Sequence, residues 1–139
     1  MKSTVIAIAA TIAMGGTGFA MDSLSQFDWK KRVLIVFGDA SDPKLTQQIE
    51  VLKSQNDELA DRDMVVLQVS GNDVRAVYGK ASRIDAARLR SEAKADGKQF
   101  EAVLVGKDGG VKLRSSQVVG NVEMFDLIDR MPMRRGGQG

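Results

Sequence analysis

The chain has 139 residues and a formal net charge of +2 at neutral pH, and it contains neither cysteine nor histidine. Without cysteine it cannot form disulfides, carry a lipid on an amino-terminal cysteine or perform thiol redox chemistry. Without histidine it cannot build Ser-His-Asp or metal–histidine centres. A charge this close to neutral does not favour nucleic-acid binding, for which a basic domain or stripe is expected.

The first twenty residues have the three parts of a secretory signal peptide. Lys2 is a positive amino-terminal residue, residues 4–14 are mostly apolar, and Gly18 and Ala20 place small residues at the −3 and −1 positions of a cleavage site. The apolar run is shorter than the ~20 residues that span a bilayer. We therefore expect residues 1–20 to be removed, the protein to be periplasmic or secreted, and no transmembrane span to remain.

A lead-in segment, residues 21–32, precedes the first predicted strand. Leu24, Phe27 and Trp29 are spaced so that all three could be buried against the rest of the protein. Residues 33–37 then form a continuous apolar run that is rich in β-branched side chains. This pattern is typical of a strand buried on both faces.

A helix and a second strand follow. Asp42 suits an N-cap and Pro43 suits the first helical position. An apolar stripe predicts that the helix continues to about residues 61–63. The stripe consists of Leu45, Ile49, Leu52 and Leu59. Residues 64–69 read as another buried strand, so the strand–helix–strand unit implies a right-handed parallel crossover.

The next stretch, residues 70–83, has the least regular pattern in the chain. Asp85 then predicts the N-cap of a second helix, and Gly97 is a plausible stop for that helix.

The last predicted elements are two strands and a helix. Residues 100–105 and 111–114 flank a turn, residues 106–110, whose Asp-Gly pair is a strong signal for an antiparallel hairpin. Asn121 can cap a final helix that Pro132 stops.

The element order βαβ-α-ββ-α predicts an α/β domain over residues 33–133. A mixed four-stranded sheet with helices on both faces satisfies this order. We expect the tail at residues 134–139, which is rich in glycine, to be disordered.

Three stretches carry a family resemblance. Residues 27–34 (FDWKKRVL) lead into the first strand, residues 106–114 (GKDGGVKLR) form the hairpin, and residues 128–135 (IDRMPMRR) end the chain. Together they resemble the DUF4174 family, whose members are exported bacterial proteins similar to a domain repeated in some animal extracellular proteins. The resemblance implies a thioredoxin-like, peroxiredoxin-related fold over nearly all of the processed chain, and it implies no activity.

Redox-active proteins of that fold place a cysteine where the first strand meets the first helix, and thioredoxins add a cis-proline before the third strand. The corresponding places here read GDASDP at residues 38–43 and KQF at residues 98–100. Because both features are missing, thiol–disulfide exchange and cysteine-based peroxide reduction are excluded. We assign no catalytic, metal-binding or cofactor-binding residue and expect no cofactor.

Polar residues nevertheless follow the first strand, at the end of the sheet where open α/β proteins bind ligands. Asp39, Ser41 and Asp42 form this candidate cleft, and Tyr78 is a further candidate. They indicate either a weak polar or cation site or a cysteine-independent active site. The simpler interpretation is that Asp42 caps the helix and Asp39 is a turn residue.

Basic residues cluster in the predicted hairpin and near the carboxyl terminus. The candidate basic patch comprises Lys107, Lys112, Arg114, Arg134 and Arg135. Such a patch would bind an acidic partner or anionic lipid headgroups. The simpler interpretation is a solvated edge strand that its charges protect against mispairing.

The sequence therefore favours an exported, non-catalytic binding or interaction module whose partner is an unidentified protein or envelope component. Two alternatives remain open. One is an enzyme that works without cysteine in the cleft around Asp39, Ser41 and Asp42. The other is a peripheral envelope-associated protein held by its basic residues.

Overall fold

The computed structural model describes residues 21–96 and 98–131. The expected signal peptide, the expected tail, Pro132 and the basic residues Arg134 and Arg135 lie outside these ranges.

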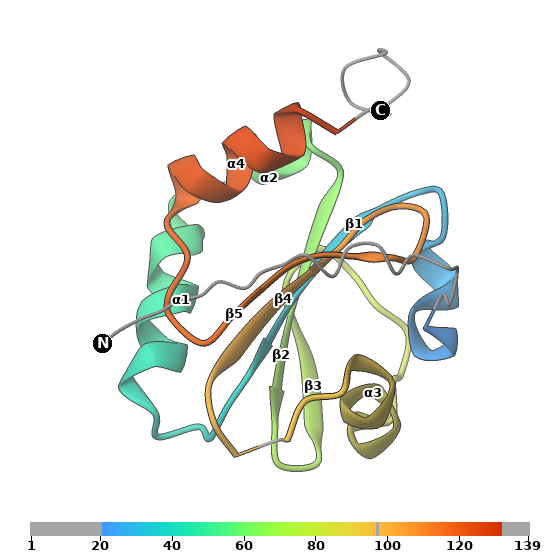
Figure 1. Ribbon diagram of the computed structural model, residues 1–139, viewed down its shortest axis with the longest axis vertical. Coiled ribbons are helices and arrows are strands. Elements are labelled where there is room, and N and C mark those ends of the chain that lie inside the picture. The colour runs from blue at the N-terminus through green and yellow to red at the C-terminus, as the bar shows by residue number, and fades with distance from the viewer. Residues whose placement is uncertain (1–20, 97, 132–139) are drawn as a thin grey trace.

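Within the described residues, five strands form one mixed sheet in the order β3-β2-β1-β4-β5 (Figure 1). They are β1 (Arg32–Phe37), β2 (Met64–Ser70), β3 (Asp73–Tyr78), β4 (Glu101–Val105) and β5 (Val111–Ser115). β1 and β2 are parallel, and the other neighbouring pairs are antiparallel. The mixed α/β architecture, the parallel pairing of the first two strands and the antiparallel hairpin are thereby confirmed.

The prediction of four strands was wrong, because β3 lies in the stretch that was expected to be irregular. Ser70 pairs with Asp73, so Gly71 and Asn72 form a two-residue turn between β2 and β3. Gly71 has φ +58°, which glycine adopts without steric penalty and which tight hairpin turns require. β3 is an edge strand with exposed and half-buried side chains, so it lacks the continuous apolar run of a central strand.

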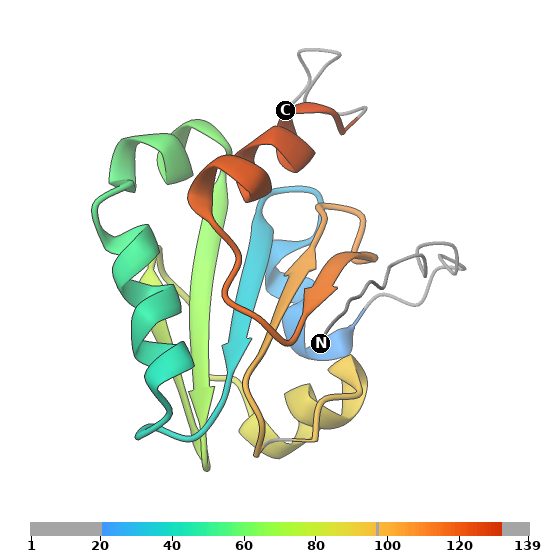
Figure 2. The ribbon, with the colours of Figure 1, turned by 60° about the vertical axis from the view of Figure 1, so that its left-hand side comes forward.

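Helices cover both faces of the sheet (Figures 1 and 2). They are the 3-10 helix η3 (Asp22–Phe27) and the α-helices α1 (Pro43–Lys53), α2 (Asn56–Asp61), α3 (Ala86–Ala93) and α4 (Asn121–Asp129). α1, α2 and α4 pack on one face with Leu34 and Val36 of β1. η3 and α3 pack on the other face with Val33, Ile35 and Phe37. Successive strand residues point to opposite faces, and β1 is therefore buried along its whole length.

The helix expected to run from Asp42 to about residue 61 is divided into two. α1 ends at Lys53, and α2 begins at Asn56. The break consists of Ser54, the C-cap of α1, and Gln55, the N-cap of α2. The short polar side chain of serine favours non-helical backbone conformations.

Two further helix ends differ from the expectation. α3 ends at Ala93 rather than near Gly97, because Lys94 adopts a left-handed conformation with φ +59°. The N-cap of α4 is Gly120, and Asn121 is already the first helical residue. Asp85 does occupy the N-cap position of α3.

The lead-in segment is buried only in part. Leu24 and Phe27 are buried as expected, but the expectation for Trp29 was wrong, because this residue is 65% exposed. Trp29 has φ +65°, and its backbone N–H donates to the carbonyl oxygen of Lys107 at 2.8 Å. This left-handed turn takes Trp29 off the face that buries Phe27.

Candidate functional site

The loop that joins β1 to α1 uses its polar side chains for local structure. Asp42 Oδ1 accepts a hydrogen bond from the backbone N–H of Lys44 at 2.9 Å and so caps α1. Asp39 Oδ1 accepts from the backbone N–H and from the hydroxyl of Ser41, both at 3.0 Å. These two bonds lower the pKa of the Asp39 carboxyl. The three candidate side chains of the loop are therefore engaged in a helix cap and a turn.

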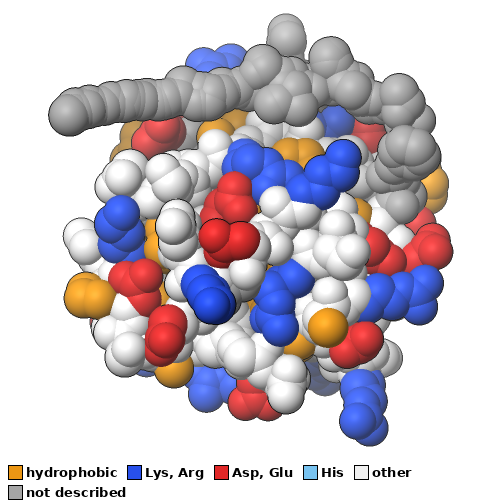
Figure 3. All heavy atoms as spheres, turned by 60° about the horizontal axis from the view of Figure 1, so that its bottom comes forward, with side chains coloured by type: hydrophobic (Ala, Val, Ile, Leu, Met, Phe, Trp, Pro, Cys, Tyr) orange, Lys and Arg blue, Asp and Glu red, His pale blue; other side chains and the backbone are white. Residues whose placement is uncertain are grey.

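The same loop lies against the segment that precedes β4. A Cβ atom on Gly38 would lie 3.6 Å from the Cα of Phe100. Asp96 Oδ1 accepts hydrogen bonds from the backbone N–H groups of Lys98 and Gln99 at 2.8 and 3.1 Å. Figure 3 turns this end of the molecule toward the viewer and shows basic and acidic side chains interspersed over it. This end therefore presents turn structure and mixed charge.

Tyr78 lies far from this loop. It pairs with Val66 near the start of β2, whereas Phe37, just before the loop, pairs with Val69 near the end of β2. β1 and β2 are parallel, so Tyr78 is at the opposite end of the sheet from Asp39, Ser41 and Asp42. The structure brings those three together and separates Tyr78 from them.

The basic side chains of the β4–β5 hairpin each lie beside a carboxylate. The pairs are Lys107–Asp63 at 2.9 Å, Lys112–Asp108 at 3.0 Å and Arg114–Glu101 at 3.0 Å. The side chain of Lys107 is only 3% exposed, so its ammonium group is inside the protein and not on a surface patch. These pairs reduce the positive charge that the hairpin can offer to a partner.

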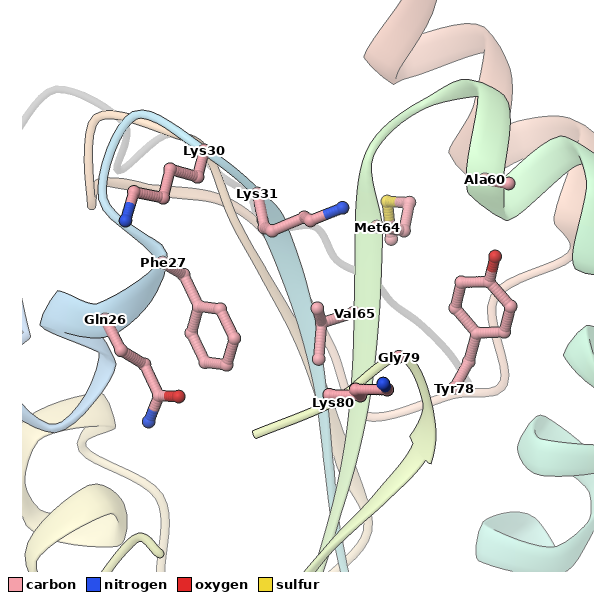
Figure 4. Close-up of a pocket in the computed structure, with 10 residues that line it drawn as sticks. All are labelled: Gln26, Phe27, Lys30, Lys31, Ala60, Met64, Val65, Tyr78, Gly79 and Lys80. Atoms are coloured by element: carbon pink, nitrogen blue, oxygen red, sulfur yellow. The ribbon is translucent and has the colours of Figure 1, made fainter. Parts of the chain in front are cut away.

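A pocket of about 430 Å³ opens at the end of the sheet where β1 and β2 begin (Figure 4). The described residues that line it come from η3 and its connection to β1, from α2, from the start of β2, and from the end of β3 with the segment that follows it. They are Gln26, Phe27, Lys30, Lys31, Ala60, Met64, Val65, Tyr78, Gly79 and Lys80. Its volume is within the range of ~300–1,000 Å³ that is usual for small-molecule sites.

The pocket lies where β3 stops covering β2. The last paired residue of β3, Tyr78, is opposite Val66, so Met64 and Val65 have a neighbour in β1 but none in β3. The chain then turns at Gly79, which has φ +87°. A Cβ atom at this position would lie 3.0 Å from Cγ2 of Val65, so the close approach of the turn to the pocket floor requires glycine.

The pocket is basic. Three of its described lining residues are lysines, Lys30, Lys31 and Lys80, and none is Asp or Glu. Unlike the hairpin cations, these lysines form no ion pair with another described residue. All three are exposed. Figure 4 shows the Lys31 side chain reaching toward Met64 and that of Lys30 lying on the side of Gln26.

Two local features position the lysines. The backbone N–H groups of Lys30 and Lys31 both donate to the carbonyl oxygen of Phe27 at 2.9 Å, which forms a tight turn at the end of η3. On the other side, the side-chain oxygen of Gln26 accepts from the Ser82 N–H at 2.8 Å, and the Gln26 amide donates to the Ser82 carbonyl at 3.4 Å. This pair of bonds holds the segment that carries Lys80 against η3.

The profile of a family described as a domain of unknown function, DUF4174, matches residues 23–136. The chain belongs to the DUF4174 family. The match covers all the strands and α-helices described above and all but the first residue of η3, and it confirms the family resemblance seen in the sequence. No curated protein is found to be similar to it.

In residues 21–96 and 98–131, no three carboxylates gather in a way that could hold a metal ion. No helix in the same ranges combines the length and the apolar character needed to cross a bilayer.

Sequence reasoning missed the pocket lysines of this DUF4174 domain. Lys30 and Lys31 were part of a stretch that carried the family resemblance, and Lys80 follows Tyr78 and Gly79, which are distinctive in their region. The two segments are about fifty positions apart in the chain, and only the sheet topology shows that they meet. The Gly71-Asn72 turn was the available signal, because it predicts a hairpin that returns the chain to the start of β2.

Proposed function

We propose that this DUF4174 protein is an exported, non-catalytic binding module with a thioredoxin-like arrangement, and that it takes its ligand in the lysine-rimmed pocket. The observation that carries the proposal is the set of three lysines around a pocket whose described lining has no carboxylate. None of the three forms a salt bridge with a described residue, although the charge of Lys31 also acts on Asp63. Positive charge concentrated in a concave site attracts and retains anionic ligands.

The thioredoxin-like part rests on topology. The central strands follow the order β2-β1-β4-β5, with α1 and α4 on one face and α3 on the other. This agrees with the βαβ-α-ββ-α order expected of the family, and β3 is an addition at one edge. The chain has no cysteine with which such a fold could carry electrons.

Binding is better supported than catalysis. A lysine nucleophile needs a desolvated amine, and the pocket lysines are exposed. In the loop after β1, the low pKa of Asp39 keeps its carboxylate ionised, which makes it a weak base near neutral pH. An envelope-bound protein held by the hairpin is also less well supported, because the hairpin cations are paired with carboxylates.

Export rests on the sequence of residues 1–20 alone. It predicts that protein recovered from the periplasm or the medium begins at Met21. Amino-terminal sequencing tests this directly, and an intact Met1 on the mature protein would contradict it.

The binding site can be tested without knowing the natural ligand. A set of small fragments, divided equally among anions, neutral molecules and cations, is added to the ¹⁵N-labelled protein, and amide shifts are followed to saturation. We expect saturable shifts with anionic fragments at Lys31, Val65 and Gly79. The amides of Asp39 and Ser41 serve as the internal control. Shifts centred on that loop, or no saturable shift near the pocket with any fragment, would contradict the proposal.

A further inference from the structure

We infer that the ligand of the pocket is a small amphiphilic anion: a carboxylate or phosphate ester held by the lysines and attached to an apolar chain or ring. This inference rests on the proposed function and specifies its ligand class. It follows from the combination of an apolar floor and a cationic rim in one site.

The floor is built from core side chains. Phe27, Met64 and Val65 are 5%, 1% and 2% exposed, and each also belongs to the packed interior on one face of the sheet or the other. The half-buried Tyr78 forms a further wall of the pocket. Because the floor side chains are already almost fully buried, the gain on binding comes from the apolar surface of the ligand itself and from the half-buried Tyr78. It amounts to ~25 cal/mol for each Å² of apolar surface that leaves water. A purely polar anion would leave that gain unused.

The rim selects the head group. Lys30 and Lys31 come from the turn before β1, and Lys80 comes from the segment after β3, so the charges belong to two separate segments (Figure 4). A neutral apolar ligand would lie beside these ammonium groups without pairing with them. A cationic ligand would be repelled, because like charges in a shared site raise the free energy of the complex.

The size of the pocket favours a small molecule as the occupant. About 430 Å³ accommodates a compact ligand. The exposed Trp29 precedes the lysines and raises a different possibility, a membrane surface that carries anionic lipid. Co-sedimentation with vesicles that contain phosphatidylglycerol, carried out beside the titration, tests membrane binding.

The test is calorimetric titration of the purified protein with three probes: decanoate, decanol and inorganic phosphate. Decanoate has both features of the inferred ligand, decanol has only the chain, and phosphate has only the charge. We expect decanoate to bind at least about tenfold more tightly than either of the other two, a difference in binding free energy of ~1.4 kcal/mol or more. Added salt should weaken the binding of decanoate and leave that of decanol unchanged.

The variant Lys30→Gln/Lys80→Gln removes two rim charges and leaves the floor intact. We expect it to weaken decanoate binding about tenfold and to leave decanol binding unchanged. The matched control is Lys53→Gln, which removes an exposed lysine of α1. It should leave the binding of all three probes unchanged. Because these side chains are exposed, folding should be retained, and circular dichroism checks this.

Three results would overturn parts of the inference. Equal affinity for phosphate and decanoate overturns the amphiphilic ligand and leaves a binding module for polar anions. Equal affinity for decanol and decanoate, with no effect of the double variant, overturns the anionic head group. Binding to anionic vesicles without binding of monomeric decanoate overturns the small-molecule inference in favour of a membrane surface. Failure of the proposed function itself is separate, because it would appear as the absence of pocket shifts in the fragment experiment.

Discussion

The ion pair between Lys107 and Asp63 makes a sharp prediction, because its two partners differ greatly in exposure. The Lys107 side chain is 3% exposed and that of Asp63 is 37% exposed, and the atoms Nζ and Oδ2 are 2.9 Å apart. Removing the carboxylate leaves a buried cation without its partner, whereas removing the cation leaves a carboxylate that water can reach. Asp63→Asn should therefore destabilise the protein more than Lys107→Met does.

The magnitude follows from the burial. Breaking a fully buried ion pair by removing one partner costs ~3–5 kcal/mol. Because water reaches Asp63, we expect about 2–3 kcal/mol for Asp63→Asn and about 1 kcal/mol or less for Lys107→Met. Asn is a suitable replacement because Asp63 has φ +53°, a left-handed conformation that asparagine tolerates well. The cost then reports the lost charge rather than backbone strain.

The pair should also make stability depend on pH. Partial burial raises the pKa of Asp63, but the hydrogen bond and charge of Lys107, with the charges of Lys31 and Arg32, outweigh it and hold the pKa below its ordinary value. A carboxyl with a lowered pKa in the folded state stabilises the protein above its unfolded-state pKa of about 4. That contribution is lost as the pH falls through the lower folded-state pKa. The difference between wild type and Asp63→Asn should therefore shrink progressively below about pH 4.

Urea unfolding followed by circular dichroism measures these free energies, and the double variant Asp63→Asn/Lys107→Met completes the cycle. The double variant should be more stable than Asp63→Asn alone, because it no longer contains an unpaired buried cation. The reasoning is refuted if Lys107→Met costs as much as Asp63→Asn. A difference between wild type and Asp63→Asn that stays constant down to pH 2 would equally refute the role given to the carboxylate.

Three further predictions concern stability, each measured by urea unfolding. Gly79 has φ +87°, and a Cβ atom there would lie 3.0 Å from the pocket floor, so Gly79→Ala should cost about 2–3 kcal/mol. Gly71 has φ +58° and open space around it, so Gly71→Ala should cost only about 1 kcal/mol. Equal costs would show that the contact is unimportant. Arg62→Lys should cost about 1–2 kcal/mol, because this buried guanidinium forks onto a carboxylate of α4 and also bonds one of α2. The exposed Arg88→Lys should change stability by less than about 0.5 kcal/mol, and a similar loss in both would argue against the fork. Asp42→Ala should cost about 1 kcal/mol through the lost cap of α1; a larger loss of binding than of stability would instead give that loop a ligand role.

Much of the core was predictable because its signal is local. The apolar run at residues 33–37 predicted a central strand, and β1 is indeed buried on both faces. The Asp-Gly turn predicted the β4–β5 hairpin, and the Asp42-Pro43 pair predicted the start of α1. In each case a few adjacent residues determine the backbone conformation, so their pattern is sufficient.

The misplaced elements share the opposite property. β3 is half exposed and has no continuous apolar run, so its pairing with β2 is what stabilises it as a strand. Trp29 was expected to be buried because of its size and spacing, yet a left-handed turn bonded to the distant Lys107 exposes it. Both outcomes depend on partners from other parts of the chain.

Composition and local pattern alone determined that this DUF4174 protein has no thiol chemistry, that it has an α/β architecture, and where its central strands lie. Only the tertiary structure decided which lysines are buried, which are paired and which lie together. It buried Lys107 against Asp63 and gathered Lys30, Lys31 and Lys80 around one pocket. The physical reason is that burial of apolar faces follows the local repeat of a helix or strand. Coulomb interactions depend instead on distances between side chains, and those distances are set only when the strands take their order in the sheet.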